Sequence, residues 1–194
     1  MRHKASQHRG GNGQLRIIAG QWRGRKLPIT NLEGLRPTPD RVRETVFNWL
    51  APYVPGARLL DCFSGSGALA FEALSRGAAH ACMLEKAGEA ARLLSGNLEL
   101  LQAKNATVIN TDALQWLAQP AAAPFDLIFL DPPFRQGLLE KTCKRLAENG
   151  YTDTETLIYM EAEKGLALSS LMPEWVMIKE KVAGQVGYSL WQVQ

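Results

Sequence analysis

The chain has 194 residues, of which 46% are hydrophobic and 21% are charged, a composition that is typical of a globular protein and excludes a mostly disordered one. No apolar run approaches the roughly 20 residues of a membrane-spanning helix, so we expect no membrane association. The net charge of +3 divides into +7 for residues 1–45 and −4 for residues 46–194, and this asymmetry favours a protein that binds a polyanion such as nucleic acid.

The N-terminal part predicts an extension ahead of the main fold. Residues 1–14 are rich in Gly, Ser, His and Lys/Arg, so we expect a flexible basic arm. Residues 15–52 form the extension, with a small hairpin within Leu15–Ile29 and a helix for which Thr38 is the expected N-cap and Pro39 the first residue. One face of this helix carries the apolar residues Val42, Val46, Trp49 and Leu50.

Residues 53–194 predict one α/β domain, because strand-like and helix-like segments alternate. The strand candidates are Arg58–Phe63, Ala81–Glu85, Thr107–Thr111, Phe125–Leu130 and Thr156–Met160. The helix candidates between them are Gly67–Arg76, Ala87–Ala103, Ala113–Ala118 and Gln136–Glu148. This alternation indicates right-handed βαβ units around a buried parallel sheet. Two last β-like runs, Trp175–Lys181 and Val186–Gln192, have no helix between them and should pair antiparallel.

The three cysteines, Cys62, Cys82 and Cys143, are scattered along the chain without the spacing of metal ligands. Three cysteines cannot all pair within one chain. We therefore expect reduced thiols, no bound metal and a cytoplasmic protein.

A glycine-rich loop follows the first parallel strand and opens a helix. It runs Asp61-Cys-Phe-Ser-Gly-Ser-Gly, and its glycines allow a tight turn and a close approach of the backbone to a ligand. Such loops lie at the carboxyl ends of parallel strands, where open α/β sheets bind nucleotides. The loop also fits the dinucleotide pattern G-x-G-x-x-A through Gly65, Gly67 and Ala70, with Glu85 where a ribose-binding acid should lie.

Asp61 favours a different nucleotide ligand. A carboxylate directly before the glycine turn would repel a pyrophosphate but would suit the cationic methionine portion of S-adenosylmethionine. Glu85, at the end of the second strand, can accept from both ribose hydroxyls, and Asp112, after the third strand, from the adenine amino group. Each acid alone could be a solvated strand end. Three such acids at one sheet edge favour a binding site.

The motif Asp131-Pro-Pro-Phe follows the apolar strand that ends at Leu130. The two prolines fix the backbone and remove two N–H donors, so carbonyl acceptors dominate there. Asp131 adds a carboxylate acceptor, and Phe134 offers a ring on which a base can stack. This set is suited to holding a planar exocyclic amine.

These two motifs together resemble the amino-methylating class of Rossmann-like S-adenosylmethionine-dependent methyltransferases. The runs Arg16–Leu27 and Arg36–Asn48 narrow the resemblance to the bacterial small-subunit ribosomal RNA guanine-N2 methyltransferases, the 16S rRNA (guanine(966)-N(2))-methyltransferases. It extends from about Leu15 to the end of the chain and includes Glu180–Tyr188, whereas residues 1–14 carry no family signature.

The resemblance implies a seven-stranded sheet of order 3-2-1-4-5-7-6 with strand seven antiparallel, helices on both faces, and S-adenosylmethionine as the methyl donor, released as S-adenosylhomocysteine. It assigns to the cofactor Thr38, Asp61, Phe63, Ser64, Gly65, Gly67, Glu85, Asp112 and Ala113. It assigns to the target base the catalytic residues Asp131, Pro132, Pro133 and Phe134. The implied partner is 16S rRNA in the 30S subunit or in a late assembly intermediate, and we expect the enzyme to be a monomer.

Basic residues of the extension are the candidates for RNA contacts. They are Arg16, Arg23, Arg25, Lys26, Arg36, Arg41 and Arg43. Arg41 and Arg43 could instead pair with neighbouring acids or with the cofactor carboxylate.

Other functions remain open from the residues themselves. A nicotinamide-dependent dehydrogenase explains the glycines and Glu85 but not Asp61 or the Pro-Pro motif. A non-catalytic RNA-binding module explains the basic extension but not the acids at three strand ends. A DNA adenine-N6 methyltransferase would use the same kinds of motif, but the catalytic domain takes up nearly all of the chain outside the basic extension and leaves no room for a separate DNA-reading domain. A protein-glutamine methyltransferase typically has Asn in place of Asp131.

Overall fold

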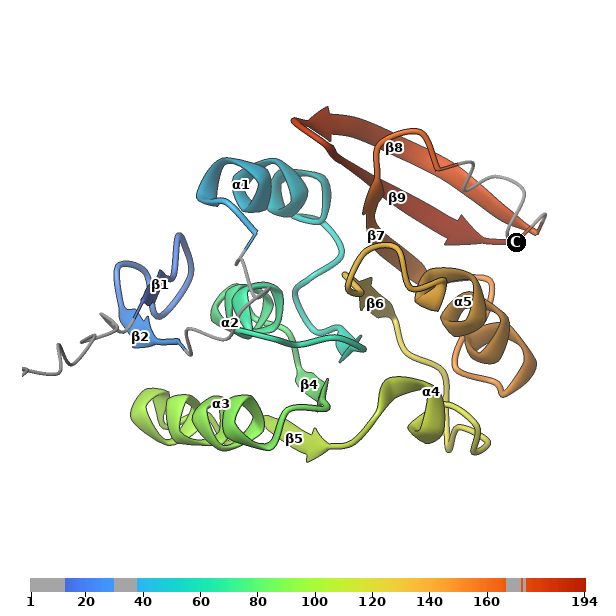
Figure 1. Ribbon diagram of the computed structural model, residues 1–194. Helices are drawn as coiled ribbons and strands as arrows, with labels where there is room; N and C mark the ends of the chain where they lie inside the picture. Colours follow the sequence, from blue (N-terminus) through green and yellow to red (C-terminus); the bar gives the residue numbers. More distant parts are fainter. Residues whose placement is uncertain (1–12, 30–37, 167–171, 173) are drawn as a thin grey trace, which may run out of the picture.

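The computed structural model describes residues 13–29, 38–166, 172 and 174–194. Its centre is a seven-stranded sheet of order β5-β4-β3-β6-β7-β9-β8 (Figure 1). The strands are β3 (Arg58–Asp61), β4 (His80–Glu85), β5 (Ala106–Asn110), β6 (Leu127–Leu130), β7 (Leu157–Glu163), β8 (Trp175–Ala183) and β9 (Val186–Val193). The first five are parallel, and β9 is antiparallel to both β7 and β8. This confirms the order 3-2-1-4-5-7-6 and the antiparallel seventh strand.

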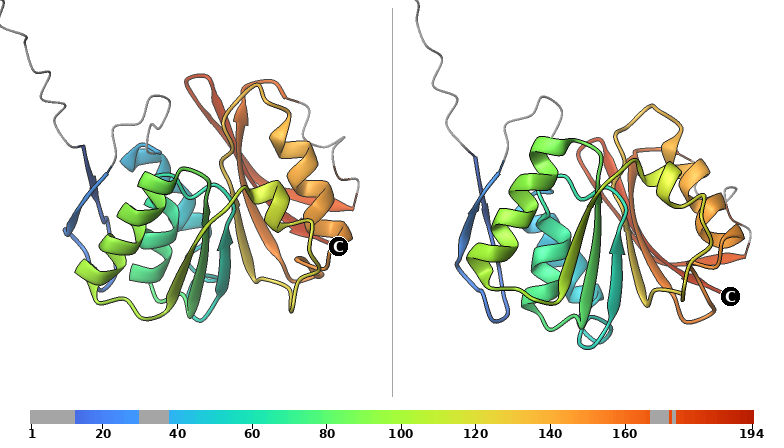
Figure 2. Two further views of the ribbon diagram at one scale, coloured as in Figure 1. Left: turned by 60° about the horizontal axis from the view of Figure 1, so that its bottom comes forward. Right: turned by 90° about the horizontal axis from the view of Figure 1, so that it is seen from below.

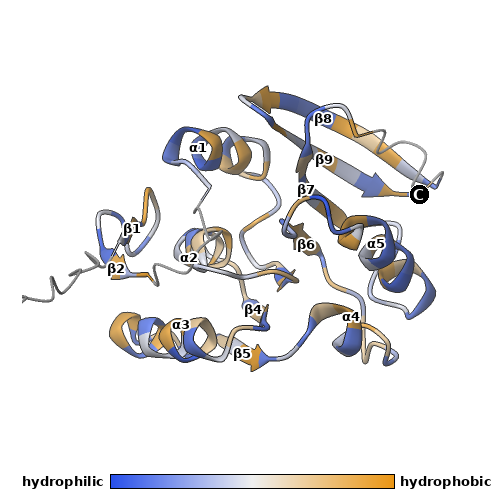
Figure 3. Ribbon diagram, viewed as in Figure 1, coloured by the Kyte–Doolittle hydropathy of each residue, from blue (hydrophilic) through white to orange (hydrophobic). Residues whose placement is uncertain are grey.

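Helices cover both faces of the sheet. One face carries α1 (Asp40–Trp49), α2 (Ala68–Ser75) and α3 (Gly88–Leu101), and the other carries α4 (Ala113–Trp116) and α5 (Leu138–Glu148) (Figure 1). The alternation of side chains along the strands produces two apolar layers, because Phe129 packs with the first group of helices and Ile128 with the second. In Figure 3 polar residues lie on the side of α5 that faces away from the sheet, whereas α2 is buried along its whole length.

The carboxyl ends of the parallel strands form the upper edge of the molecule in both views of Figure 2. The loops that leave these ends carry the two motifs singled out in the sequence. We call this side the carboxyl edge of the sheet.

The N-terminal hairpin consists of β1 (Gln14–Arg16) and β2 (Lys26–Pro28) and lies beside α2 and α3 (Figure 2). Gln14 already belongs to β1, so the predicted flexible arm of residues 1–14 is one residue too long; residues 1–12 lie outside the described residues. Leu15 and Leu27 are buried in the same apolar layer as Leu59 of β3. The hairpin therefore shares its core with the sheet.

Backbone hydrogen bonds to α2 fix the hairpin loop. The amides of Ile18 and Ala19 donate to the Glu72 carboxylate at 2.8 and 3.0 Å, and the Trp22 amide donates to Ser75 Oγ at 3.0 Å. Gly20 has a φ of +82°, and a Cβ there would lie 1.9 Å from the Ser75 carbonyl oxygen. Only glycine can bring the loop this close to the end of α2.

Glu72 lies at the centre of this attachment and is fully buried. Arg76 Nε donates to it at 2.8 Å, and Arg43 NH1 lies 3.7 Å from it. We call this set, in which two cations and two amides surround one carboxylate, the Glu72 junction. The helix pair α1 and α2 and the hairpin meet there.

The start of α1 differs from the prediction. Pro39 is the N-cap, the helix begins at Asp40, and no side chain caps it. The prediction of Thr38 as N-cap is therefore wrong, because the Thr38 hydroxyl instead donates to Glu161 Oε1 at 2.9 Å. The predicted apolar face is confirmed, with Val46 and Leu50 buried against the sheet.

All three cysteines are buried in the layer between the sheet and the helices α4 and α5. Burial raises the pKa of the Cys82 thiol to about 11 and that of Cys143 to about 12. Within the described ranges, no helix has the length and apolar character needed to cross a bilayer.

Candidate active site

The glycine-rich loop joins β3 to α2 at the carboxyl edge. Gly65 and Gly67 have φ values of +51° and +78°, which favour glycine. The Ser64 amide donates to the Leu84 carbonyl at 3.0 Å, which ties the loop to β4. A Cβ at Gly67 would lie 2.3 Å from the Phe71 ring, so packing within α2 also requires this glycine.

Glu85 ends β4 and holds the loop in place. Its carboxylate accepts from the Gly65 amide at 2.8 Å and from the Ala87 amide at 2.7 Å. Each oxygen retains a second lone pair, so the carboxylate can still accept from two hydroxyl groups of a ribose. The sequence did not indicate its bonds to the loop.

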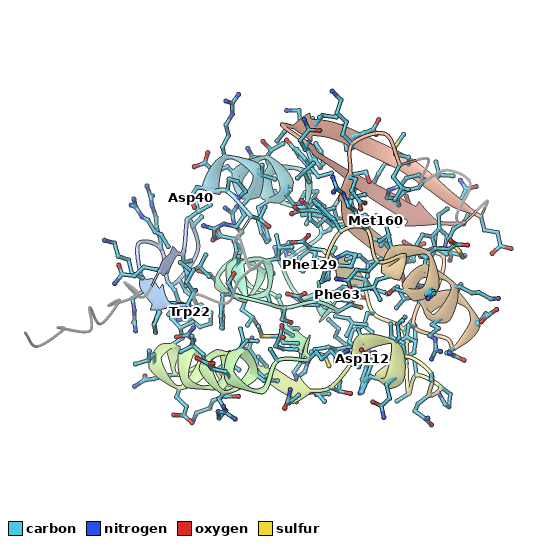
Figure 4. The ribbon with its side chains drawn as sticks, viewed as in Figure 1. Trp22, Asp40, Phe63, Asp112, Phe129 and Met160 are labelled. Carbon is cyan, nitrogen blue, oxygen red and sulfur yellow. The ribbon has the colours of Figure 1, made fainter. Side chains whose placement is uncertain are left out.

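Asp112 is the N-cap of α4, directly before the buried Ala113. Its carboxylate accepts from the Gln115 amide at 3.1 Å and pairs with Lys86 Nζ at 3.0 Å. The hydrogen bond from Lys86 is the main reason that the pKa of Asp112 is lowered, and the capped amides add to it. Figure 4 shows Asp112 at the start of α4, with Phe63 and Phe129 nearer the middle of the molecule.

Three acids lie on one face of three adjacent strands at the carboxyl edge. Asp61 is opposite Phe129 in the register of β3 and β6, and Asp131 follows two residues later on the same face. Leu130 is opposite Met160 at the end of the pairing between β6 and β7, and the next residues, Asp131 and Glu161, are close enough for the charge of Glu161 to act on Asp131. We call Asp61, Asp131 and Glu161 the acid cluster.

Burial and mutual repulsion dominate the electrostatics of the acid cluster. The pKa of Asp61 is raised to about 7, mainly by burial and further by the charge of Glu85. The Phe63 amide, which donates to Asp61 at 3.4 Å, lowers this pKa in part. Burial, then the charges of Glu161 and Asp61, raise the pKa of Asp131 well above its usual range. The described residues place no cation within ion-pair distance of these three carboxylates. The cluster is therefore suited to a cationic or hydrogen-bond-donating ligand.

Glu161 was missed in the sequence. It is buried and accepts from the Tyr159 hydroxyl at 2.8 Å and from Thr38. Burial raises its pKa, and these two hydrogen bonds partly oppose the rise. A signal was present, because Glu161 directly follows the predicted strand Thr156–Met160, as Asp131 follows the predicted strand before it; in the structure Glu161 lies within β7.

The Asp131-Pro-Pro-Phe motif leaves β6 toward the surface. Pro132 is buried, Pro133 is exposed, and the Phe134 side chain is 38% exposed. The next residue, Arg135, has a φ of +61°, and its amide donates to Glu163 of β7. The structure thus holds the motif beside β7 with the ring of Phe134 accessible.

The basic candidates of the extension divide into two groups. Exposed side chains belong to Arg16, Arg23, Arg25, Lys26 and Arg41. Arg25 also donates to the Leu100 carbonyl of α3 at 2.8 Å. Arg43 is 1% exposed and pairs with Asp40 at 2.6 Å. Its side chain therefore follows the alternative of pairing with acids and is not available for an RNA contact. Arg36 lies outside the described residues.

Comparisons with known proteins agree with this arrangement. The chain matches the family described as conserved hypothetical protein 95 over residues 15–192. It is 53% identical over 182 residues to ribosomal RNA small subunit methyltransferase D of Escherichia coli (strain K12), covering 94% of this chain and 91% of that protein. The methyltransferase D of Haemophilus influenzae is 50% identical over 184 residues, covering 93% and 94%. The solved structure of the Escherichia coli protein yhhF superposes with a TM-score of 0.87 at 50% identity, covering 94% of this chain and 99% of that one.

Proposed function

We propose that this chain, which belongs to the family described as conserved hypothetical protein 95, transfers a methyl group from S-adenosylmethionine to the N2 amine of a guanine in 16S rRNA. The relatives of the chain include ribosomal RNA small subunit methyltransferase D. The proposed target is guanine 966, following the resemblance of the N-terminal runs. The single observation that carries the proposal is the position of Asp131-Pro-Pro-Phe beside the acid cluster and the glycine-rich loop.

The residues at the carboxyl edge fit S-adenosylmethionine. Asp61 is a buried carboxylate without a cation among its described neighbours, and the ammonium group of a methionine moiety would supply one. Glu85 keeps free lone pairs for the ribose, and the backbone at Gly65 allows close approach. Phe63 and Ala113 border the same edge, and Asp112 would have to exchange Lys86 for the adenine amine.

The mechanism follows from the acceptors around the amine. When bound, S-adenosylmethionine supplies an electrophilic methyl group on its sulfonium. The guanine N2 amine is a weak nucleophile because its lone pair is delocalised into the ring. Asp131 and the Pro132 carbonyl would accept hydrogen bonds from its two hydrogens and so direct the lone pair toward the methyl group. Asp131 would also take the proton that the amine loses.

The target base has to leave its stack to reach Asp131. Phe134 and Pro133 are exposed, and the ring of Phe134 would stack on the extruded base. The exposed cations of the hairpin, Arg23, Arg25 and Lys26, would contact phosphates near the target. The enzyme would act as a monomer on the 30S subunit or on a late assembly intermediate.

A labelled-methyl transfer assay tests this proposal. Small ribosomal subunits that lack the modification, and naked 16S rRNA, are incubated with the protein and methyl-labelled S-adenosylmethionine, and the RNA is digested to nucleosides. We expect N2-methylguanosine, and fragment mass spectrometry would locate it. N6-methyladenine formed in DNA would favour the alternative methyltransferase, and binding of NADH without S-adenosylmethionine would overturn the proposal.

A further inference from the structure

We propose that Glu161 selects guanine by accepting a hydrogen bond from the N1–H of the target base while Asp131 holds its N2 amine. This inference rests on the proposed function and names a residue that determines its substrate. It starts from the side-by-side arrangement of two carboxylates at the carboxyl edge.

The register of the sheet places the two acids together. The last pair between β6 and β7 is Leu130 and Met160, Asp131 and Glu161 are the next residues of the two segments, and the charge of Glu161 acts on the Asp131 carboxyl. Phe129 and Tyr159, two residues earlier on the same face, have ring centroids 6.1 Å apart, which shows that this face is continuous across the two strands. Neighbouring strands are about 4.8 Å apart, a spacing that lets two adjacent carboxylates contact one base edge.

Hydrogen bonds orient the Glu161 carboxylate and leave part of it unused. Both the Tyr159 hydroxyl and the Thr38 hydroxyl donate to the same oxygen, Oε1. None of the residues in the described ranges donates to Oε2. Glu161 is only 6% exposed, so its carboxylate is largely shielded from water and competes little with bulk solvent for a donor. A donor on the substrate could therefore bind to the oxygen that the fold does not use.

Guanine offers the matching donors. Its N1–H and its N2 amine are neighbours on one edge of the ring, whereas adenine has an acceptor at N1 and no amine at C2. Two neighbouring acceptors therefore fit guanine and oppose a base with a lone pair at N1, because a buried polar group left without its partner rejects the wrong substrate. Asp131 alone can hold an amine, but a second acid is needed to read N1 at the same time.

The base 2-aminopurine separates the two roles, because it keeps the exocyclic amine and has an acceptor at N1. Small subunits are reconstituted with 16S rRNA that carries either guanine or 2-aminopurine at the methylated position, and kcat/KM for methyl transfer is measured for both. Loss of a hydrogen bond to a charged group corresponds to about 10- to 100-fold. We expect the wild-type protein to prefer guanine by about this factor.

The variants locate the discrimination. Glu161→Gln presents an amide that can donate to N1 of 2-aminopurine, so the preference should fall to within a few-fold. The matched control Tyr159→Phe removes one hydrogen bond to Glu161 but keeps the carboxylate, so the preference should stay at the wild-type value. This ratio compares two substrates of one preparation, so partial misfolding does not change it.

The outcomes distinguish this inference from the proposed function. Failure of the wild-type protein to methylate either substrate contradicts the proposed function. Methylation of guanine and 2-aminopurine at equal rates keeps the proposed function and overturns the role of Glu161. A Glu161→Gln protein with the full wild-type preference overturns it as well, above all if Asp131→Asn loses the preference.

Discussion

Two sites in this molecule contain buried carboxylates, and their surroundings differ. At the Glu72 junction, two cations and two backbone amides surround a carboxylate that is fully buried. In the acid cluster, Asp61, Asp131 and Glu161 face one another, and the described residues bring no cation to them. A buried charge is tolerated only when it is paired or neutralised. The first site is thus complete within the fold, and we expect ligands to complete the second.

The largest expected effect tests the ligand-completed group. Asp131→Ala should lower methyl transfer by about 10⁴-fold, the upper end for a placed base, because the same carboxylate also orients the amine. Asp131→Asn keeps one acceptor and should retain part of the activity. S-adenosylmethionine affinity, measured by calorimetry, should stay near that of the wild type in both. Normal turnover by Asp131→Ala would refute the assigned role.

The next effect tests the group that is complete within the fold. Glu72→Gln should lower the free energy of unfolding by about 3–4 kcal/mol, because it leaves Arg76 without its carboxylate and leaves the buried Arg43 with Asp40 alone. Urea unfolding measures this change. Glu99→Gln, an exposed acid on α3, is the matched control and should stay within about 0.5 kcal/mol of the wild type. Equal urea midpoints for the Glu72 variant and this control would show that the Glu72 junction contributes nothing to the free energy of unfolding.

A third prediction concerns pH and has the opposite sign. The folded-state pKa of Asp61 is about 7, above its ordinary value of 3.8, so the folded protein keeps a proton that the unfolded chain has lost. The stability that this retained proton contributes to the folded state is lost as the pH rises from about 4 through 7. Asp61→Asn should therefore be more stable than the wild type at pH 8, by up to about 4 kcal/mol, because the pKa rises from 3.8 to about 7 and each unit corresponds to about 1.36 kcal/mol.

This gain should shrink as the pH falls from 7 toward 4, which thermal unfolding at several pH values measures. The same variant should bind S-adenosylmethionine much more weakly, because it removes the carboxylate that receives the cationic group. A variant that loses stability at pH 8 would mean that Asp61 is already compensated within the fold, like Glu72.

The smallest effect concerns the surface of the extension. Replacing Arg23, Arg25 and Lys26 by alanine should weaken RNA binding at low salt and flatten the salt slope by about 0.7–0.9 for each phosphate that the protein no longer neutralises. Lys141→Ala with Lys144→Ala, on the opposite face of the sheet, is the control and should leave the slope unchanged. Cofactor affinity should not change in either variant. An unchanged slope in the triple variant would move the RNA surface elsewhere.

The sheet order and most elements could be predicted from the sequence, because alternating strands and helices leave few right-handed arrangements. The burial of Arg43 could not, because its partner Glu72 is distant in sequence and only the packing of α1 on α2 brings them together. The place of Thr38 before a proline predicts an N-cap, whereas its hydroxyl instead donates to Glu161, which is distant in sequence. Local patterns thus predict elements, and long-range hydrogen bonds decide which polar residues reach the site.

The three cysteines lie together in one layer, between the sheet and the helices α4 and α5, and all are buried. Their thiols are shielded in the folded protein, so a thiol reagent can react only after this layer opens. The rate of labelling therefore measures the opening of one half of the molecule, while the half that contains the hairpin and α1 to α3 stays silent. The same arrangement leaves the surface free of native thiols, so a single cysteine introduced on the hairpin could carry a fluorophore that reports when RNA arrives.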